Sequence, residues 1–504
     1  MFNHLNISLN NKMHKIAIIG SGFSGLSAAA YLAAAGNEVH VFEKNIQGGG
    51  RARQLKTESG YVFDMGPSWY WMPNVFETFF KDFGFSVSDF YDLKLLNPSF
   101  EIVFGKNDTM SIPENYDELC DLFESMEQGS STQLNKFMVE AEYKYKTGIE
   151  NIVYKPGLSV TEFIDLDLIK GAFRLQVFSS FSKHVRKYFS NPKLIALMEF
   201  PVLFLGAMPS ETPALYSLMN YAGLKLGTYY PMGGFGKVID GMTEVAKRNG
   251  VIFHYNSPVE KIEIENNQAS KIIYNGKEFE CDAVVASADY HHVESKLLPV
   301  EYRNYTEAYW DKKTFAPSSL IFYLGVNKRI NSLEHHTLFF DEDLDLHSKE
   351  IYKTPQWPTK PLFYVCCPSK TDNEIAPTGH ENLFLLMPIA TGLKDTEELR
   401  EKYFNIILER LEKQTGQEIK SHIDYKKSYC VNDFILDYNS FKGNAYGLAN
   451  TLKQTANLKP KIRNKKIKNL FYTGQLTVPG PGVPPSIISG KVAATQLLKH
   501  IKNT

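Results

Sequence analysis

The chain has 504 residues, which is long enough for two or three domains with a sizeable hydrophobic core. Its 43% hydrophobic and 22% charged residues indicate a globular protein, and the formal net charge of −1 excludes a global field that would recruit nucleic acid. Five cysteines without CxxC spacing argue against a disulfide framework and favour a reducing compartment.

The first predicted elements are a strand, a glycine-rich turn and a helix. An apolar run from Ile16 to Ile19 predicts the strand, and an alanine-rich stretch from Leu26 to Ala35 predicts the helix. The turn between them reads GxGxxG. Gly20 permits a tight turn, Gly22 lets the backbone approach a pyrophosphate, and Gly25 lets the helix pack closely on the strand. The free N–H groups and positive dipole at the helix start suit phosphate.

A second predicted strand, from Val39 to Phe42, leads directly into Glu43. This acid follows Gly20 by 23 residues, close to the spacing expected of a carboxylate that binds the ribose of a dinucleotide. A carboxylate here favours a ribose without a phosphate group. The strands, the helix, the glycines and the acid have the order and spacing of a dinucleotide-binding unit. We therefore expect a nucleotide site and not a merely structural turn.

A second glycine turn follows at Gly48–Gly50 and leads into Arg51. Small residues let the backbone approach a charged ligand, and the arginine guanidinium offers a fork of donors that fits a phosphate. The alternative is a flexible loop with a solvated arginine. The stretch Tyr61–Pro67 is then predicted as a strand that enters a turn.

From Asn74 to about Ser210 the pattern predicts mainly helices, among them residues 75–83, 116–125 and 134–146. Between Ala172 and Ser190, apolar and aromatic side chains recur at helical spacing beside basic ones. This pattern predicts either an interfacial helix on a membrane or an amphipathic helix packed on the protein's own core. The residues with this spacing are Phe173, Val177, Phe181, His184 and Tyr188.

The alternation of strands and helices then resumes. A glycine-rich turn precedes a predicted helix over 237–249, and strands are predicted over 251–255 and 281–288. Strands over 320–326 and 383–388 and a helix over 396–414 mark a second, mixed region. The chain closes with a predicted strand over 469–473, a glycine- and proline-rich loop, and a helix from about Ser486, which is expected to cap that helix. The positive helix dipole there would face an electron-rich ring.

No metal site is predicted. His291–His292 and His335–His336 are adjacent pairs, without the i, i+4 spacing of helical metal ligands, and HExxH does not occur. A GxSxG nucleophile elbow is also missing.

Taken together, these motifs resemble those of the bacterial-type carotenoid desaturases, which include phytoene desaturase, within the amine-oxidase-like FAD superfamily. The resemblance covers nearly the whole chain. It is carried by IAIIGSGFSGLSAAAYLAAAG with VHVFEK, GGGRAR, FDMGPS, YYPMGGFGKVIDGM, GVIFHYNSPVEKI and NLFYTGQLTVPGPGVPPSIISGK.

The resemblance implies an α/β fold with a Rossmann-like FAD-binding domain of the amine-oxidase type and an inserted α+β substrate domain. The FAD-binding domain would be discontinuous, with residues 13–70, 230–295 and 465–504. Residues 71–229 would form a mainly helical region that faces the substrate or a membrane. Residues 296–464 would form the substrate domain, with a mixed sheet.

The resemblance also assigns roles within an FAD site. Glu43 would hold the adenosine ribose, Arg51 the phosphate and ribitol region, and Val259 the adenine edge. The expected cofactor-binding residues are Gly20, Gly22, Phe23, Ser24, Gly25, Glu43, Lys44, Gly50, Arg51, Gly66, Pro67, Ser68, Val259, Gly474, Gln475, Gly482, Val483 and Pro484. No catalytic side chain is assigned, because the flavin itself is expected to accept the hydride. The sequence departs from many relatives at Gln475, Leu476 and Val478, beside the expected flavin ring.

The implied activity is FAD-dependent desaturation in carotenoid biosynthesis, either of the phytoene type or at the 3,4 bond. Carotenoid isomerisation or ketolation, amine oxidation on the same fold, and a non-catalytic prenyl-binding escort protein stay open as alternatives. Expected partners are a lipophilic polyene, a membrane surface, and a quinone or oxygen as electron acceptor. The apolar run Leu194–Pro209 is too short to span a bilayer and contains Glu199. We therefore expect a cytoplasmic protein, peripheral on the inner face of the cell membrane.

Overall fold

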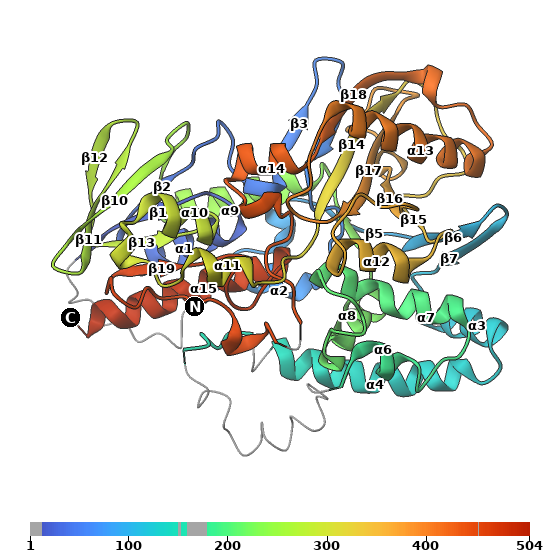
Figure 1. Ribbon diagram of the computed structural model, residues 1–504, viewed down its shortest axis with the longest axis horizontal. Coiled ribbons are helices and arrows are strands. Elements are labelled where there is room, and N and C mark those ends of the chain that lie inside the picture. Colours follow the sequence, from blue (N-terminus) through green and yellow to red (C-terminus); the bar gives the residue numbers. More distant parts are fainter. Residues whose placement is uncertain (1–12, 150–152, 159–178, 452, 504) are drawn as a thin grey trace.

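The computed structural model describes residues 13–149, 153–158, 179–451 and 453–503. Figure 1 shows three regions: a half built on a parallel sheet, a half built on a larger mixed sheet, and a group of helices below the mixed sheet. The parallel sheet contains β1, β2 and β13, the mixed sheet β14 to β17, and the helical group α3, α4, α6 and α7.

The parallel sheet has the strand order β19-β13-β1-β2-β9 within the described residues, and all of its pairings are parallel. Its strands are β1 (Lys15–Ile19), β2 (Glu38–Phe42), β9 (Ile252–His254), β13 (Ala283–Ala286) and β19 (Leu470–Tyr472). These strands fall in the three separate segments that the sequence assigned to one domain.

Helices cover one face of the parallel sheet and a small sheet covers the other. Helix α1 (Phe23–Ala34) packs against both α9 (Phe235–Arg248) and α15 (Val483–Lys502). The opposite face shares a core with the antiparallel strands β10 (Val259–Glu265), β11 (Gln268–Tyr274) and β12 (Lys277–Glu280). Each face of the parallel sheet is therefore buried, as its continuous apolar strands predict.

Small residues let the N-terminal and C-terminal helices approach closely. A Cβ added at Gly490 of α15 would lie 2.4 Å from the Ser24 carbonyl oxygen and 2.6 Å from Ser27 Cβ of α1. Ser27 Oγ also donates to the Ile487 carbonyl at 2.7 Å. A Cβ at Gly25 would lie 2.1 Å from the Gly20 carbonyl oxygen, so the third glycine of GxGxxG serves helix packing.

The mixed sheet has the order β18-β14-β17-β16-β15-β6-β7 within the described ranges. Only β15 and β6 pair in parallel; the other neighbours are antiparallel. Helix α13 (Glu397–Thr415) buries one side against this sheet. The strands are β6 (Phe100–Gly105), β7 (Asp108–Ile112), β14 (Ser318–Val326), β15 (His336–Phe339), β16 (Phe363–Cys366), β17 (Glu381–Ile389) and β18 (Ile423–Tyr429).

The prediction of helices throughout 74–210 is wrong for residues 93–112. They form β5 (Leu93–Leu95), β6 and β7, and the last two extend the mixed sheet. The β6–β7 hairpin turns through Asn107, whose φ is +60°, a conformation that asparagine tolerates. The α-helices described in the region are α2 (Pro73–Asp82), α3 (Tyr116–Met126), α4 (Ser130–Thr147), α6 (Phe181–Val185) and α7 (Pro192–Glu199), and α8 (Leu218–Asn220) follows it.

The candidate interfacial segment packs on the protein's own core where the structure describes it. Phe181 and His184 are fully buried, and Tyr188 is half-buried. Phe173 and Val177 lie outside the described residues. The apolar face of α6 is therefore used for internal packing, so of the two alternatives the packed helix holds for Phe181 and His184. Across the part of the chain that is described, no helix combines the length and apolarity needed to cross a membrane.

The final helix begins earlier than predicted. It starts at Val483 with Gly482 as its N-cap, and Ser486 Oγ donates to the Gly482 carbonyl at 2.8 Å, so Ser486 is not the cap. Two prolines in the first turn explain the early start, because their φ is already helical and their missing N–H costs nothing there. Further elements are β3 (Gln54–Lys56), β4 (Val62–Asp64), β8 (Tyr229–Pro231), α10 (Tyr290–His292), α11 (Glu307–Asp311), α12 (Leu344–Tyr352) and α14 (Val431–Tyr438).

Replacing Gly490 by alanine tests the close contact of α1 with α15. The new methyl group would collide with backbone, so we expect Gly490→Ala to destabilise the protein by about 1–3 kcal/mol. The measurement is the midpoint of thermal unfolding by circular dichroism. Gly105→Ala is the control, because nothing lies within 4 Å of its added Cβ and its φ is ordinary. A midpoint equal to that of the wild type in Gly490→Ala would contradict this packing.

A buried glutamate ties the C-terminal strand to the rest of the parallel-sheet half. Glu294, in the π-helical turn Val293–Leu297, is 1% exposed. It accepts hydrogen bonds from the backbone N–H groups of Asn304 and Tyr305, at 2.8 and 3.1 Å, and from the Tyr472 hydroxyl of β19 at 3.1 Å. Burial raises its pKa from 4.5 to about 7.

This raised pKa predicts a pH dependence of stability. The folded protein holds the Glu294 proton up to about pH 7 whereas the unfolded chain loses it near 4.5, so this stability contribution is lost as the pH rises between those values. We expect Glu294→Gln to lose less stability than the wild type between about pH 5 and pH 8, by up to roughly 3 kcal/mol. Thermal midpoints of both proteins at the two pH values measure this difference. Parallel pH profiles would refute the assignment.

Candidate functional site

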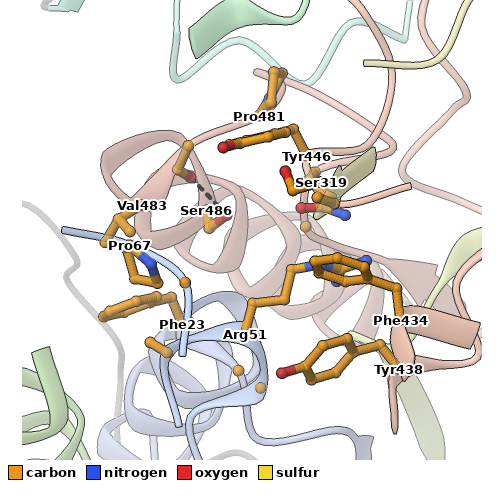
Figure 2. Close-up of a pocket in the computed structure, with 18 of the residues that line it drawn as sticks. Phe23, Arg51, Pro67, Ser319, Phe434, Tyr438, Tyr446, Pro481, Val483 and Ser486 are labelled. Carbon is orange, nitrogen blue, oxygen red and sulfur yellow. Dashed lines mark hydrogen bonds between the residues drawn. The ribbon is translucent and has the colours of Figure 1, made fainter. Parts of the chain in front are cut away.

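A cavity of about 450 Å³ runs from the glycine-rich turn after β1 into the space between the mixed sheet and the helical region. Its walls come from segments far apart in the chain, including the β1–α1 turn, the end of β2, α12, α14 and residues 473–486. Figure 2 shows Phe23, Pro67 and Val483 together on one side, Phe434 and Tyr438 on the other, and Arg51 between them.

The predicted cofactor-binding residues converge on this cavity. Gly25 is the exception, because it faces the Gly20 carbonyl inside the β1–α1 packing. Lining the cavity are Gly20, Gly22, Phe23, Ser24, Glu43, Lys44, Gly50, Arg51, Gly66, Pro67, Ser68, Val259, Gly474, Gln475, Gly482, Val483 and Pro484. The individual contacts of these residues with a cofactor stay a prediction.

Glu43 lies at one end of the cavity with its carboxylate fixed. It is 5% exposed, and its oxygens accept from Ser21 N and Oγ, both at 2.9 Å, and from Asn45 N and Nδ2 at 2.9 and 3.0 Å. Two of these donors are backbone groups that stay in place. The other two are on side chains that can rotate, so a ribose diol can replace them. Lys44 turns its ammonium group away, onto the Leu436 carbonyl at 2.6 Å.

The start of α1 forms a cradle for a phosphate. The helix has no side-chain cap, so its first N–H groups are available to a ligand in the cavity. A Cβ added at Gly22 would meet only Gly50 Cα, at 4.0 Å, which leaves the backbone open to a close approach. Glycines at these two positions therefore suit a pyrophosphate.

Arg51 adds a positive charge with an unused donor. Its Nη2 donates to Ser440 Oγ at 3.2 Å and to the Asn444 carbonyl at 3.1 Å, and its guanidinium lies 5.0 Å from the centre of the Tyr438 ring. Its Nε is buried and has no hydrogen-bond partner among the described residues. In the orientation that satisfies both of its amide atoms, Gln475 accepts from Arg51 Nη2 at 3.0 Å.

The charge environment of Arg51 favours an anionic ligand. Burial lowers the pKa of Arg51, and the nearby Asp289 carboxylate opposes that effect. A buried guanidinium with a free N–H next to an uncapped helix start is the arrangement that phosphate binding uses. Together with Glu43, these groups fit the ribose and pyrophosphate of a dinucleotide such as FAD.

The start of α15 offers fewer donors than a typical helix start. Pro484 and Pro485 occupy its first turn and have no N–H, so the helix presents the N–H groups of Gly482 and Val483 with its positive dipole. Pro67 and Val483 both line the cavity (Figure 2). This end of the cavity therefore offers few backbone donors to a ligand.

The other arm of the cavity is mainly apolar, and no sequence motif predicts its residues. These side chains come from elements that meet only in the fold. The indole of Trp69 stacks on the imidazole of His336, with ring centroids 4.1 Å apart. The apolar lining residues are Trp69, Trp71, Phe200, Leu203, Met219, Leu338, Phe340, Leu344, Ile351 and Leu386.

Replacing Glu43 by glutamine tests the ribose assignment. The change removes a charge and two of the acceptor positions, so we expect the FAD dissociation constant to rise by about tenfold or more. Flavin fluorescence titration measures that constant, and absorbance gives FAD per chain after desalting. Glu263→Gln on β10, outside the cavity lining, is the matched control. Equal affinity in the Glu43→Gln and Glu263→Gln variants would remove Glu43 from the site.

Two characterised relatives match nearly the full chain. The carotenoid 3,4-desaturase of Haloarcula japonica is 42% identical over 487 residues, which is 96% of this chain and 98% of the relative. The zeta-carotene-forming phytoene desaturase of Myxococcus xanthus is 28% identical over 503 residues, which is 98% of this chain and 95% of the relative. These matches confirm the predicted resemblance to carotenoid desaturases.

Among solved structures, an oxidoreductase from Methanosarcina mazei has the same fold. It superposes with a TM-score of 0.59 at 18% identity and covers 96% of this chain and 100% of its own. At that identity the likeness concerns the fold alone.

The family match includes both ends of the cavity. The sequence matches the family described as flavin containing amine oxidoreductase over residues 23–498, from the first turn of α1 to near the end of α15. The predicted fold class and the predicted FAD cofactor are thereby confirmed. The chain belongs to the flavin-containing amine oxidoreductase family and is an FAD-dependent oxidoreductase.

Proposed function

We propose that this protein is a carotenoid desaturase that introduces a carbon–carbon double bond into a polyene. The observation that carries the proposal is one cavity whose lining includes both a cradle for a dinucleotide and a mainly apolar arm. The two relatives described above support this substrate class, because both are carotenoid desaturases.

In this reaction FAD supplies the redox chemistry, and the residues of the cavity wall hold the substrate and the cofactor. Forming the double bond removes a hydride from one carbon and a proton from its neighbour. FAD, when bound, would supply the acceptor for the hydride, and the proton is released to solvent. Trp69, Trp71 and Phe200 exclude water and hold an extended apolar chain. Arg51 and Glu43 hold the opposite end of the cofactor, so that binding and orientation are the main contributions of the protein.

Of the two steps that the sequence left open, we propose the one at the 3,4 bond. The relative that carries out this step is 42% identical, whereas the phytoene desaturase is 28% identical over a similar length. The 3,4 bond lies near the end of a carotenoid chain. The proposal therefore needs only an end group, and not the middle of the polyene, to reach the closing loop at residues 474–483.

We further propose that the protein works at the inner face of the cell membrane and passes its electrons to a quinone or to oxygen. A carotene dissolves in the bilayer, so an enzyme with this substrate has to collect it from a membrane surface. The reduced FAD also has to be reoxidised after each turnover, and both a quinone and oxygen are available at the membrane.

A carotenoid panel in liposomes tests these proposals. Protein loaded with FAD is given phytoene, a carotenoid with a saturated 3,4 bond, or an amine. Each substrate is tested without any acceptor, with a quinone in the absence of oxygen, and in air. We expect an absorption red shift with the second substrate, at least about tenfold faster than with phytoene, only when quinone or air is supplied. Peroxide formation with the amine would favour the amine oxidase, and a colourless folded protein would favour the escort protein.

Four outcomes separate the parts of this proposal. No red shift with any carotenoid would overturn the desaturase. A faster shift with phytoene would overturn the 3,4 step and leave the desaturase intact. A spectral change without reduction of the flavin would indicate isomerisation. Equal activity with carotenoid in detergent and in sedimented liposomes, with no protein in the pellet, would contradict work at a membrane.

A further inference from the structure

Two histidines and a cysteine converge behind the apolar arm of the cavity. His335 directly precedes β15, His336 opens it, and Cys366 closes β16, where it pairs directly with His336 across the strands. The three residues are 4%, 0% and 1% exposed. One potential ligand atom from each lies within 4.8 Å of the others, and among the residues that the structure describes no second group of this kind occurs.

The hydrogen bonds of the two imidazoles leave one nitrogen free on each ring. His335 Nδ1 bonds to Thr371 Oγ1 and His336 Nδ1 to the Tyr364 hydroxyl, both at 2.6 Å. Both Nε2 atoms are buried without a partner in the described part of the chain. Tyr364 donates its own proton to Ser68 Oγ at 3.0 Å, so it accepts from His336 Nδ1–H. His336 Nε2 therefore carries a bare lone pair.

Bare imidazole nitrogens beside a thiol in a dry interior are costly unless something satisfies them. Metal-binding histidines show this same pattern, with one ring nitrogen anchored to an oxygen and the other free for the ion. Burial lowers the pKa of His335 to about 3 and that of His336 well below its usual value, so both rings are neutral. Two neutral imidazoles and one sulfur are a donor set that suits zinc.

The spacing of the three side chains is close to what a zinc ion needs. Zinc bonds of about 2.0–2.3 Å place tetrahedral ligand atoms roughly 3.3–3.8 Å apart. The observed limit of 4.8 Å requires closure by at most about 1.5 Å, which side-chain rotation can supply. Three protein ligands leave the fourth position for a water molecule.

We propose that His335, His336 and Cys366 bind one Zn²⁺ ion. The ion joins the ends of β15 and β16 and fixes the His336 ring, on which the cavity residue Trp69 stacks. Its role is to hold this wall of the apolar arm in place. The inference rests on the side-chain cluster alone and does not depend on which polyene the protein acts on.

The neighbouring cysteine provides a matched control. Cys367 is also fully buried, but it packs in the other core of the mixed sheet, where its Sγ contacts Ser369 Oγ and Glu381 Oε2 at 3.5 Å. Cys366→Ser and Cys367→Ser thus make the same chemical change on opposite faces of one strand end.

Metal analysis of the FAD-loaded full chain tests the proposal. Each protein is stripped with a chelator, incubated with Zn²⁺, desalted and measured by mass spectrometry for zinc and by absorbance for FAD. We expect about one zinc per chain in the wild type and in Cys367→Ser, and at least about tenfold less in Cys366→Ser and in His335→Asn. Removal of zinc by the chelator should change tryptophan fluorescence in the wild type and in Cys367→Ser only.

The FAD content of each sample shows whether a variant is folded. Zinc per chain is therefore compared only between samples whose FAD content equals that of the wild type. Zinc below about 0.1 per chain in flavin-loaded wild type overturns the proposal. Equal zinc in Cys366→Ser and Cys367→Ser overturns it as well, because the metal would then be bound elsewhere. Neither result bears on the desaturase assay, which uses a different readout.

Discussion

The fold depends on the close contact between α1 and α15. Gly490 of α15 lies on Ser24 of α1, so the first and last helices approach at backbone distance, and Gly25 lets α1 pack on the Gly20 carbonyl. Any larger side chain at these points would separate the helices, and with them the two ends of the cavity. This contact explains how the turn after β1 and the loop at residues 474–483 form one site although nearly the whole chain lies between them.

The dinucleotide end of the site could be predicted from the sequence because its signals are local. The glycine-rich turn, the spacing to Glu43 and the arginine after Gly50 each lie within one βαβ unit, where chain geometry fixes their relative positions. Predictions from local sequence patterns were wrong where contacts between distant parts of the chain determine the structure. Within the stretch at 93–112, β6 pairs with β15, more than 200 residues away. The prolines after Val483 moved the start of α15 ahead of Ser486.

The substrate arm and the proposed zinc site could not be predicted in this way. Trp69, Phe200 and Phe340 belong to segments with no fixed spacing, and only the topology of the mixed sheet brings them together. The sequence predicts no metal site at His335–His336, because adjacent residues lack the spacing of helical metal ligands. The third member, Cys366, becomes its neighbour through the β15–β16 pairing, which the sequence pattern does not specify.

The discontinuous parallel sheet has a consequence for the order of folding. Strand β1 lies between β2, its neighbour in the sequence, and β13, and the edge strand β19 comes near the end of the chain. During synthesis β1 and β2 are made long before β13 and β19, so the parallel sheet cannot be completed until these later strands have emerged. The mixed sheet can be completed before the parallel one, so the nucleotide site is the last part of the molecule to form and the first to be lost on C-terminal truncation.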